Sequence, residues 1–364
     1  MIEIKQISTT KEFAAIKEEW NSLLIKSDAA TIFLTWEWAF SWWEAFSDPN
    51  MCLYILVAME NKKIIAIAPL FITKRVLLKL FRINEINFLG AKIANGEYLD
   101  FIIDSSCDTA EILTCIFNHL DNHTKHWDRF HLTDIPETSS SLHCAADIAK
   151  ARQYWFAIKD KSVCPFVVLP ESWNALKSSL SKKTRKNLEY QHRRLQDRLG
   201  VTFSPYNKTT IETDVNSFLA LHKKLWNSRG KPGSLTNQRK QQFYHAIAVR
   251  FSKRDWLRLC FLKADNVPIA ALFGFQYQKK FYYLQSGYDP LWSKYSIAQV
   301  NLACIFENLI SEGCSEFDFL RGTEPYKYQW GAIDKKNVIF TFSRRNIKST
   351  LFHALSSLKI KLWK

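Results

Sequence analysis

The chain has 364 residues, 47% of them hydrophobic, and a formal net charge of +15, which predicts a globular protein large enough for two domains and excludes a disordered or fibrous one. Its longest nearly unbroken apolar run, residues 64–72, is shorter than the roughly 20 residues of a transmembrane helix, and the N-terminus has no signal-peptide pattern. Eight scattered cysteines without a Cys-x-x-Cys motif favour reduced thiols in a cytoplasmic protein over a disulfide framework or a metal site.

The charge divides the chain into two parts. Residues 1–155 hold 15 Lys and Arg against 20 Asp and Glu, whereas residues 156–364 hold 35 against 15. The basic part indicates a polyanionic partner such as CoA, a nucleotide-linked sugar, tRNA or an anionic membrane face. The charge step and the prolines that follow it predict an N-terminal domain over residues 1–158 and a C-terminal domain over residues 159–347.

Alternating apolar residues predict pairs of strands in both halves. Leu53–Val57 and Ile64–Ala68 form the first pair, and Leu257–Leu262 and Ile269–Gln276 form the second. Each pair is separated by a polar turn, so the halves share a rhythm of helices followed by strands.

Residues 182–198 predict a strongly basic helix. Ser181 is a suitable N-cap, and leucines 188, 195 and 199 form a stripe that would face the core. The segment holds seven Lys and Arg residues, and Arg185 near its start is suited to bidentate phosphate contacts. A solvated helix face explains the charge equally well. The segment lacks the interleaved aromatics of a nucleic-acid site, so sequence-specific nucleic-acid binding is not expected.

Residues 281–331 predict a strand, a polar loop, an apolar helix and a second strand. The first strand covers Phe281–Gly287, and the helix begins near Ile297 and stops at Gly313. The helix start would present unpaired N–H groups, which attract phosphate. Residues Ser293, Lys294, Ser296 and Ile297 are therefore the candidates for binding a phosphate-bearing acyl donor.

This unit resembles the acyl-CoA-binding core of GNAT-type acetyltransferases, in particular the large variant of the cellulose-biosynthesis CelD-type proteins and the FemABX aminoacyltransferases. Earlier blocks resemble the same family, including Phe33–Trp38, Asn87–Gly90, Tyr98–Phe101 and Leu180–Arg185. The resemblance implies an α/β chain of tandem GNAT-like folds, each a mixed, mostly antiparallel sheet flanked by helices. It implies acetyl-CoA, or another acyl-CoA, as co-substrate without a metal. The family often has a Pro-Gly pair where this chain has residues 295–298, so an aminoacyl-tRNA donor remains an alternative.

Acyl transfer to an amine requires a base, donors for an oxyanion and a proton for the leaving group. His222 falls at the family-matching histidine, and an ordinary imidazole pKa near 6.5 suits a general base. Asp318, beside the donor helix, is a second candidate if burial raises its pKa. Tyr288 is placed to protonate the leaving group. Ordinary structural roles are open for all three.

Four more residues are candidates for binding substrate. Lys327 and Arg321 lie in the aromatic-basic turn after the second strand, and the resemblance implies that the lysine meets the donor carbonyl or a substrate phosphate. Asp100 matches a carboxylate of the N-terminal domain that could orient an amino-sugar acceptor or simply cap a strand. Arg185 completes the set, as a phosphate contact.

The resulting prediction is a cytoplasmic N-acetyltransferase that acts on an amine of a sugar, a polysaccharide precursor or another envelope metabolite, with the acceptor between the domains. A FemABX-like tRNA-dependent aminoacyltransferase is the first alternative. The second is a non-catalytic module for membrane-surface binding or polysaccharide assembly. The basic, amphipathic tail over residues 348–364 would either pack as a helix or lie against an anionic membrane.

Overall fold

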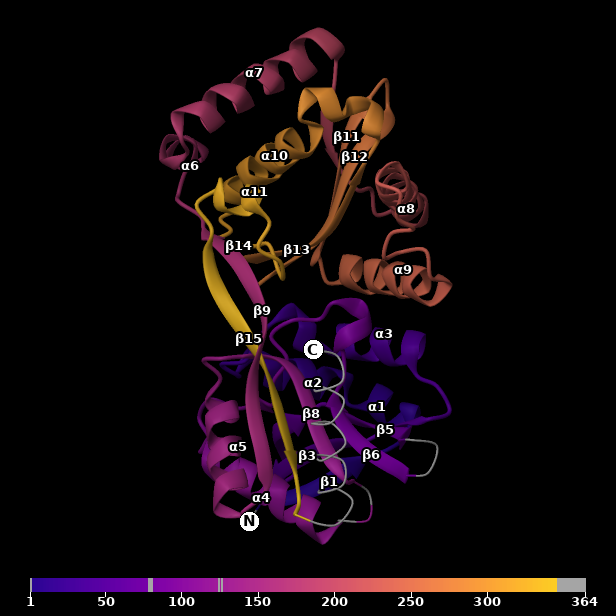
Figure 1. Cartoon of the computed structure of the whole chain (residues 1–364), viewed down its shortest axis with the longest axis vertical. Helices are drawn as coiled ribbons and strands as arrows, with labels where there is room; N and C mark the ends of the chain where they lie inside the picture. The colour runs from indigo at the N-terminus through magenta and orange to yellow at the C-terminus, as the bar shows by residue number, and fades with distance from the viewer. Residues whose placement is uncertain (1, 78–80, 124, 126, 346–364) are drawn as a thin grey trace, which may run out of the picture. The chain divides into compact units, whose positions relative to one another are not determined.

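The computed structural model describes residues 2–77, 81–123, 125 and 127–345. The chain forms two units, one made of residues up to Ser162 together with those from Lys336 onward, and the other of residues 163–335. It passes from the first unit to the second within strand β9 (Trp155–Val168) and returns within β15 (Ile333–Ser343) (Figure 1). The predicted boundary after residue 158 thus falls inside a strand, and the predicted tail, 348–364, lies outside the described residues.

The first unit combines two groups of strands with helices rich in aromatic residues. One sheet has the order β1-β3-β4-β7, and the other group runs β15-β8-β6-β5-β2, with β6 and β8 parallel. Helix α3 begins after Thr35, whose side chain accepts from the Trp38 amide, and it buries Trp38 and Trp42 completely. Its elements are β1 (Glu3–Ile7), α1 (Thr10–Ala15), α2 (Lys17–Ile25), α3 (Trp36–Phe46), β2 (Met51–Leu53), β3 (Ile55–Glu60), β4 (Lys63–Ala68), β5 (Leu70–Leu77), β6 (Phe81–Phe88), β7 (Ile102–Ile103), α4 (Thr109–Asn122), β8 (Arg129–Pro136) and α5 (Ser140–Ala151).

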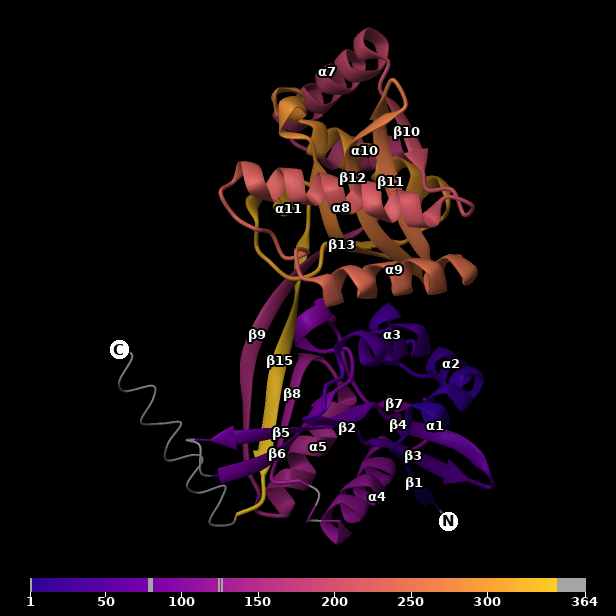
Figure 2. The ribbon, with the colours of Figure 1, turned by 90° about the vertical axis from the view of Figure 1, so that its right-hand side faces the viewer.

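The second unit is a sheet with helices on both faces. The strand order is β10-β11-β12-β13-β14-β9, and only β13 and β14 run parallel among the pairs described. Helix α10 covers one face with α6 and α7 beyond it, and α8 and α9 cover the other (Figures 1 and 2). The elements are α6 (Trp173–Ser179), α7 (Lys182–Leu199), β10 (Thr202–Pro205), α8 (Ile211–Ser228), α9 (Gln238–Lys253), β11 (Leu257–Ala264), β12 (Val267–Tyr277), β13 (Lys280–Tyr288), the 3-10 helix η4 (Pro290–Tyr295), α10 (Ile297–Ser311), β14 (Glu316–Asp318) and α11 (Pro325–Tyr328).

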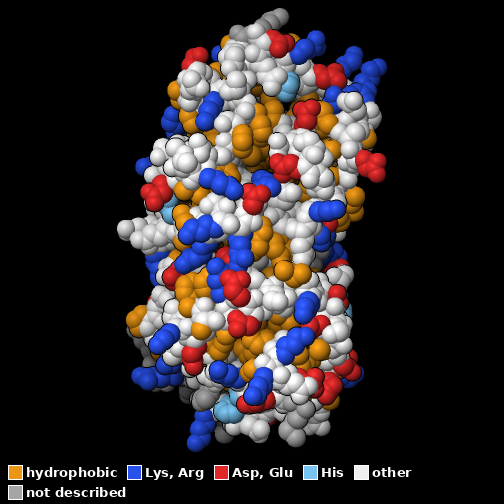
Figure 3. Space-filling view, turned by 180° about the vertical axis from the view of Figure 1, so that it is seen from behind, with side chains coloured by type: hydrophobic (Ala, Val, Ile, Leu, Met, Phe, Trp, Pro, Cys, Tyr) orange, Lys and Arg blue, Asp and Glu red, His pale blue; other side chains and the backbone are white. Residues whose placement is uncertain are grey.

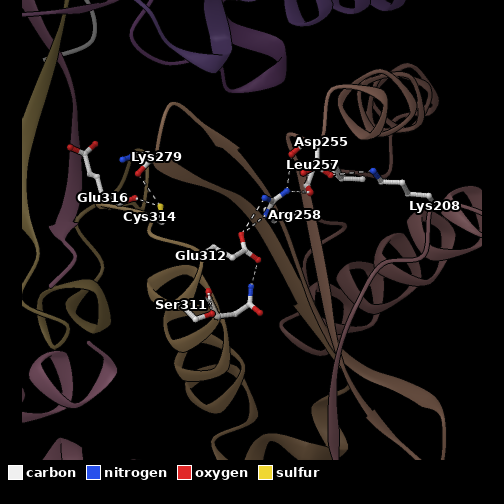
Figure 4. Close-up of polar contacts among 10 residues, drawn as sticks. Lys208, Asp255, Leu257, Arg258, Lys279, Ser311, Glu312, Cys314 and Glu316 are labelled. Atoms are coloured by element: carbon white, nitrogen blue, oxygen red, sulfur yellow. Dashed lines mark hydrogen bonds and ion pairs between the residues drawn. The ribbon is translucent and has the colours of Figure 1, made fainter. Parts of the chain in front are cut away.

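The predicted architecture of mixed, mostly antiparallel sheets flanked by helices is confirmed. The strand, loop, helix and strand expected over residues 281–319 are present as β13, η4, α10 and β14. The far end of α10 is tied to β11, because the Arg258 guanidinium donates to Glu312 Oε2 at 3.2 and 3.3 Å and Asn308 donates to Glu312 Oε1 at 2.6 Å (Figure 4). The opposite end of α10, its first two turns, lines the candidate site.

Helix α7 agrees with the predicted basic helix except at one position. Ser181 caps it by accepting from the Thr184 amide at 3.1 Å, and Leu188 and Leu195 are buried. Leu199 is instead 37% exposed, because it is the last residue of the helix and the chain turns away at Gly200, which has φ of +58°. Figure 3 shows Lys and Arg interleaved with Asp and Glu over the face that it draws. None of the helices in the described part of the chain is long and apolar enough to cross a membrane.

Candidate active site

Strands β13 and β14 separate after three residue pairs, and a cavity lies where they part. They pair only through residues 280–282 and 316–318, after which β13 continues to Tyr288 whereas β14 ends at Asp318. The cavity has a volume of about 440 Å³. Its lining comes from α8 (Leu225, Trp226, with Arg229 just after it), β12 (Ala270, Ala271, Leu272), β13 (Tyr283, Leu284, Gln285, Ser286, Gly287, Tyr288), α10 (Ala298, Gln299, Asn301, Leu302) and the segment after β14 (Phe319, Arg321, Glu324, Tyr326, Lys327).

A β-bulge shapes the wall of this cavity. Phe273 of β12 pairs with Gln285, but the next residue, Gly274, pairs with Tyr283, so Leu284 lies outside the register of the ladder. Bulges bend a strand and free backbone groups from its pairing, and they are frequent next to active sites. Leu284, the residue at this bulge, lines the cavity.

Helix α10 begins at the predicted residue, but without the side-chain cap that a serine usually provides. Ser296 is its N-cap residue in the left-handed conformation, with φ of 52° and ψ of 37°, and its side chain makes no capping hydrogen bond within the described residues. Glycine adopts this conformation without the steric cost that serine bears. The Ile297 side chain is buried in the core and Ser293 Oγ donates to the Pro290 carbonyl, so donor binding here would rest on backbone N–H groups and on Lys294.

Two cations gather beside this helix start. The Arg194 guanidinium of α7 lies 4.5 Å from the ring centroid of Tyr295, and Lys294 Nζ lies 5.2 Å from the same centroid. Cations stack favourably on aromatic faces, and helix N-termini favour anions. This group, the Tyr295 cation pair, makes the neighbourhood of Ser296 electropositive.

His222 lies behind β13 and does not line the cavity. It is 1% exposed and absent from the cavity lining, and its ring centroid lies 6.2 and 5.9 Å from those of Phe218 and Trp226. The backbone of β13 approaches α8 so closely here that a Cβ on Gly287 would lie 2.3 Å from the backbone nitrogen of His222. Burial lowers the pKa of His222 to about 4, against a smaller opposing effect of its hydrogen bond with Gln285. The imidazole is thus neutral and a far weaker base than the ordinary value near 6.5 led us to expect.

Asp318 is fully buried at the end of β14, and its carboxylate contacts neighbouring residues. Its Oδ1 accepts from the Leu320 amide at 2.7 Å, and its Oδ2 lies 3.9 Å from Lys335 Nζ. Leu320 has φ of 55°, a conformation that costs free energy and persists only where neighbours hold it. These contacts indicate a loop-holding role, and a catalytic role for Asp318 stays a prediction.

Lys327 is also engaged internally although it lines the cavity. Its ammonium donates to the carbonyl oxygens of Leu320, Arg321 and Gly322 at 3.2, 3.0 and 2.8 Å, and it lies 2.9 Å from Glu324 Oε2. With 3% of its side chain exposed, the lysine fastens the turn that carries Arg321 to the cavity wall. Direct contact with a substrate carbonyl stays a prediction for Lys327.

A chain of hydroxyl groups runs along the cavity. Tyr283 donates to Ser286 Oγ at 2.6 Å, and Tyr326 hydrogen-bonds to Tyr283. Burial raises the pKa of both tyrosines, so both are protonated at neutral pH. Tyr288 lines the same cavity, as its predicted role requires.

The remaining predicted residues lie elsewhere. Arg185 is half-buried in the first turn of α7 and is not part of the cavity lining. Asp100 belongs to the first unit, where it borders a separate cavity of about 320 Å³. It accepts from the Phe101 amide at 2.8 Å and from Ser139 and Ser141, and burial raises its pKa to about 6.

Of the predicted residues, Tyr288, Arg321 and Lys327 thus share the cavity. Five further residues that line it, Tyr283, Gln285, Ser286, Asn301 and Tyr326, were not among the predicted site residues, and Glu324, in the same turn as Arg321 and Lys327, lines it as well. The one available signal was their position within or next to the segment already singled out. Among the described residues, no group of His, Cys, Asp and Glu is arranged to hold a metal ion.

Comparisons with known proteins assign the domain that carries this cavity. Residues 182–328 match the family model described as "Acetyltransferase (GNAT) domain". The structure is similar to the crystal structure of FemX, with a TM-score of 0.62 and 11% identity over 93% of this chain and 96% of that one.

Two further crystal structures share the fold. A conserved protein of unknown function from Bacteroides thetaiotaomicron gives a TM-score of 0.57 and 13% identity, over 94% of this chain and all of the other. The C-terminal domain of a candidate lysylphosphatidylglycerol synthetase from Agrobacterium fabrum gives 0.53 and 10%, over 95% and 97%. No curated protein sequence matches. Residues 182–328 are therefore similar to a GNAT acetyltransferase domain, within a fold that the chain shares with FemX along nearly its whole length.

Proposed function

We propose that the protein is an N-acyltransferase that moves acetyl, or another acyl group, from an acyl-CoA to an amine. The observation that carries this proposal is the cavity between the diverging strands β13 and β14, which opens inside the matched domain beside a β-bulge and the start of α10. Such a cavity provides a partly enclosed, polar space in which a thioester and an amine can meet.

Each chemical requirement has a candidate group. Glu324 is the carboxylate that lines the described cavity, and we assign it to take the proton from the acceptor ammonium. The backbone at Leu284 would donate to the oxyanion. Tyr288, or Ser286 at the end of the hydroxyl chain, would protonate the departing thiolate. The Tyr295 cation pair and the α10 N-terminus would bind the donor phosphates.

The acceptor is proposed to be an amine of a sugar, a polysaccharide precursor or a related envelope metabolite. The CelD-type resemblance of the sequence supports this choice. Arg229 and Arg321 in the cavity lining would suit an acceptor that carries an anionic group. The proposed donor also implies a cytoplasmic location.

An aminoacyl group is the second candidate for the transferred acyl. The similarity in fold to FemX and to the Agrobacterium domain supports it, and so does the left-handed Ser296, at a place where a glycine would let a pyrophosphate approach more closely. In that case aminoacyl-tRNA would be the donor, and the basic face of α7 would meet its phosphates.

Calorimetric titration with acetyl-CoA at two salt concentrations tests the donor, and thiol release in the presence of amino sugars tests the reaction. Lys294→Glu should weaken acetyl-CoA binding, whereas Lys253→Glu, at the far end of α9, should not. A wild-type protein that binds no acetyl-CoA at low salt would refute the acyl-CoA donor and favour aminoacyl-tRNA.

A further inference from the structure

Another cavity, within the first unit, has lysines around its rim. It has a volume of about 410 Å³, and its lining comes from α2 on one side and from β1, β3 and β4 on the other. One lysine lies on β1, one directly after α2, one in the turn between β3 and β4, and one at the start of β4: Lys5, Lys26, Lys62 and Lys63. They are four of the 15 Lys and Arg residues in residues 1–155, a part of the chain whose total charge is negative. This lysine-rimmed cavity is therefore opposite in charge to the sequence around it.

The carboxylates of the lysine-rimmed cavity do not neutralise it. Glu19 and Asp104 line it, and Asp104 Oδ1 accepts from Ser106 Oγ at 2.7 Å. Hydrogen bonds from Ser106 lower the pKa of Asp104, and the nearby ammonium groups of Lys26 and Lys63 add smaller effects. None of the four lysines forms a salt bridge with another described residue. Four ammonium groups against two carboxylates leave an excess of two positive charges, and a cavity with such an excess concentrates anions.

The wall beneath these lysines is apolar. Ile7, Leu23 and Val57 line the cavity and are buried, and Ile16 and Ile64 are half-buried beside them. Apolar ligand atoms gain free energy when they leave water for such a wall. A bare inorganic anion would use the lysines alone. The lining as a whole thus suits an anion that also carries an apolar group.

We propose that the lysine-rimmed cavity binds a phosphate monoester with a short apolar group, with the phosphate at the lysines and the apolar group against Ile7, Leu23 and Val57. A phosphate monoester carries about 1.5 to 2 negative charges at neutral pH, which matches the excess of positive charge better than a carboxylate does. The cavity volume falls within the range of roughly 300 to 1,000 Å³ that is usual for small-molecule sites. This site lies in the first unit, and the inference does not depend on the acyl donor proposed above.

The position of Lys62 permits a test that preserves the fold. Lys62 has φ of 63°, a left-handed conformation that glycine adopts without steric cost. Lys62→Gly therefore removes one ammonium group, and we expect its unfolding temperature to equal or exceed that of wild type. Lys279→Gly is the matched control, because Lys279 has φ of 61° in the turn between β12 and β13, outside this cavity.

Calorimetric titration of the full chain with hexyl phosphate tests the site. We expect saturable binding by wild type that weakens at high salt, with inorganic phosphate and hexanol each binding about tenfold or more weakly and hexanoate in between. Lys62→Gly and Lys5→Gln should each weaken the binding of hexyl phosphate about threefold at low salt, because each removes one exposed cation. Lys279→Gly should bind it as wild type does.

Two results would overturn the inference. One is hexyl phosphate binding no more tightly than hexanol, or not saturably, to wild type. The other is binding that neither Lys62→Gly nor Lys5→Gln weakens, since the ligand would then lie elsewhere. Inorganic phosphate that binds as tightly as hexyl phosphate would overturn the role of the apolar wall, and hexanoate that does so would overturn the choice of phosphate. The titration with acetyl-CoA is separate, so failure of this inference leaves the proposed function intact.

Discussion

The cavity of the second unit and the cavity around Asp100 differ in how their buried polar groups are satisfied. Asp100 accepts from a backbone amide and two serines, so its carboxylate is fully engaged in holding local structure. In the second unit, the buried amide oxygen of Asn301, a residue that lines the cavity, has no hydrogen-bond partner within the described residues. Burial of a polar group therefore does not by itself mark a functional site. A buried polar group without a partner differs from Asp100 in that it destabilises the folded protein.

The largest effect is expected at Glu324, the carboxylate assigned as general base in the cavity of the second unit. Glu324→Gln keeps the shape of the side chain but cannot take a proton, so we expect thiol release from acetyl-CoA to slow by about 10²- to 10⁴-fold. The loss should lie in kcat, with acetyl-CoA affinity by calorimetry unchanged. Glu312→Gln, which alters a carboxylate of the same unit outside the cavity, is the matched control.

An unchanged rate in Glu324→Gln would contradict the assignment of Glu324 as the general base. The cavity of the second unit would then have no identified base, as the cavity around Asp100 has none. A fall in unfolding temperature would instead show that the ion pair with Lys327 is its main role. Because 55% of the Glu324 side chain is exposed, we expect that ion pair to contribute little to stability.

The next largest effect is a pH dependence of the unfolding free energy that arises from His222, because this imidazole is buried and neutral. Its pKa of about 4 lies below the ordinary 6.5, so the folded protein resists a proton that the unfolded chain accepts. The resulting stability is complete above pH 6.5 and is lost as the pH falls through 4, by roughly 3 kcal/mol. His222→Gln lacks this titration. Urea unfolding at pH 7 and pH 4 should therefore show the gap between wild type and variant shrinking or reversing at the lower pH.

Phe218→Leu controls for packing near His222, since it alters a ring neighbour without removing a titratable group. Its cost in unfolding free energy should be the same at both pH values. A gap between wild type and His222→Gln that does not depend on pH would mean that His222 is reached by water, and it would reopen the general-base role.

Asp100 should respond to pH in the opposite direction. Burial raises its pKa to about 6, so the folded protein holds the proton more tightly than the unfolded chain. Wild type therefore loses stability as the pH rises from about 4 through 6, by roughly 3 kcal/mol in total. Asp100→Asn does not titrate, so its unfolding free energy relative to wild type should improve by that amount between pH 4 and pH 7.

Phe101→Leu, beside Asp100, should show no such trend with pH in the same urea titrations. If Asp100→Asn instead falls further behind wild type above pH 6, the carboxylate is charged and satisfied by its hydrogen bonds. Asp100 would then be a candidate for holding an amine, as the sequence resemblance suggested.

The elements around the site were predictable because their signals are local. Helix α10 is a continuous apolar run that ends before Gly313, and β13 is an aromatic strand closed by Asp-Pro. The cavity lining was not predictable to the same degree, because it depends on where β13 and β14 part and on the bulge at Leu284, which are properties of strand pairing.

The surroundings of individual side chains were not predictable for a related reason. His222 occupies a family-matching position on a helix, but its environment is set by Gly287, which lies 65 residues later in the chain and lets β13 approach. The sequence around Lys327 gives no sign that the side chain is buried, yet the carbonyl oxygens of Leu320, Arg321 and Gly322 accept hydrogen bonds from its ammonium. Such long-range contacts decide burial and pKa, and no local pattern encodes them.

The smallest expected effect concerns Arg194 in the Tyr295 cation pair. Arg194→Met keeps much of the side-chain volume on the Tyr295 ring but removes the charge, so donor phosphates would lose one partly exposed cation. Such charges contribute little in water, and we expect acetyl-CoA affinity to fall about threefold at low salt and hardly at all in high salt. Arg193→Met, on the same helix but without the Tyr295 contact, should change affinity less. Equal losses at both arginines would mean that α7 acts on the donor through its total charge, and a loss at neither would move the phosphates away from the start of α10.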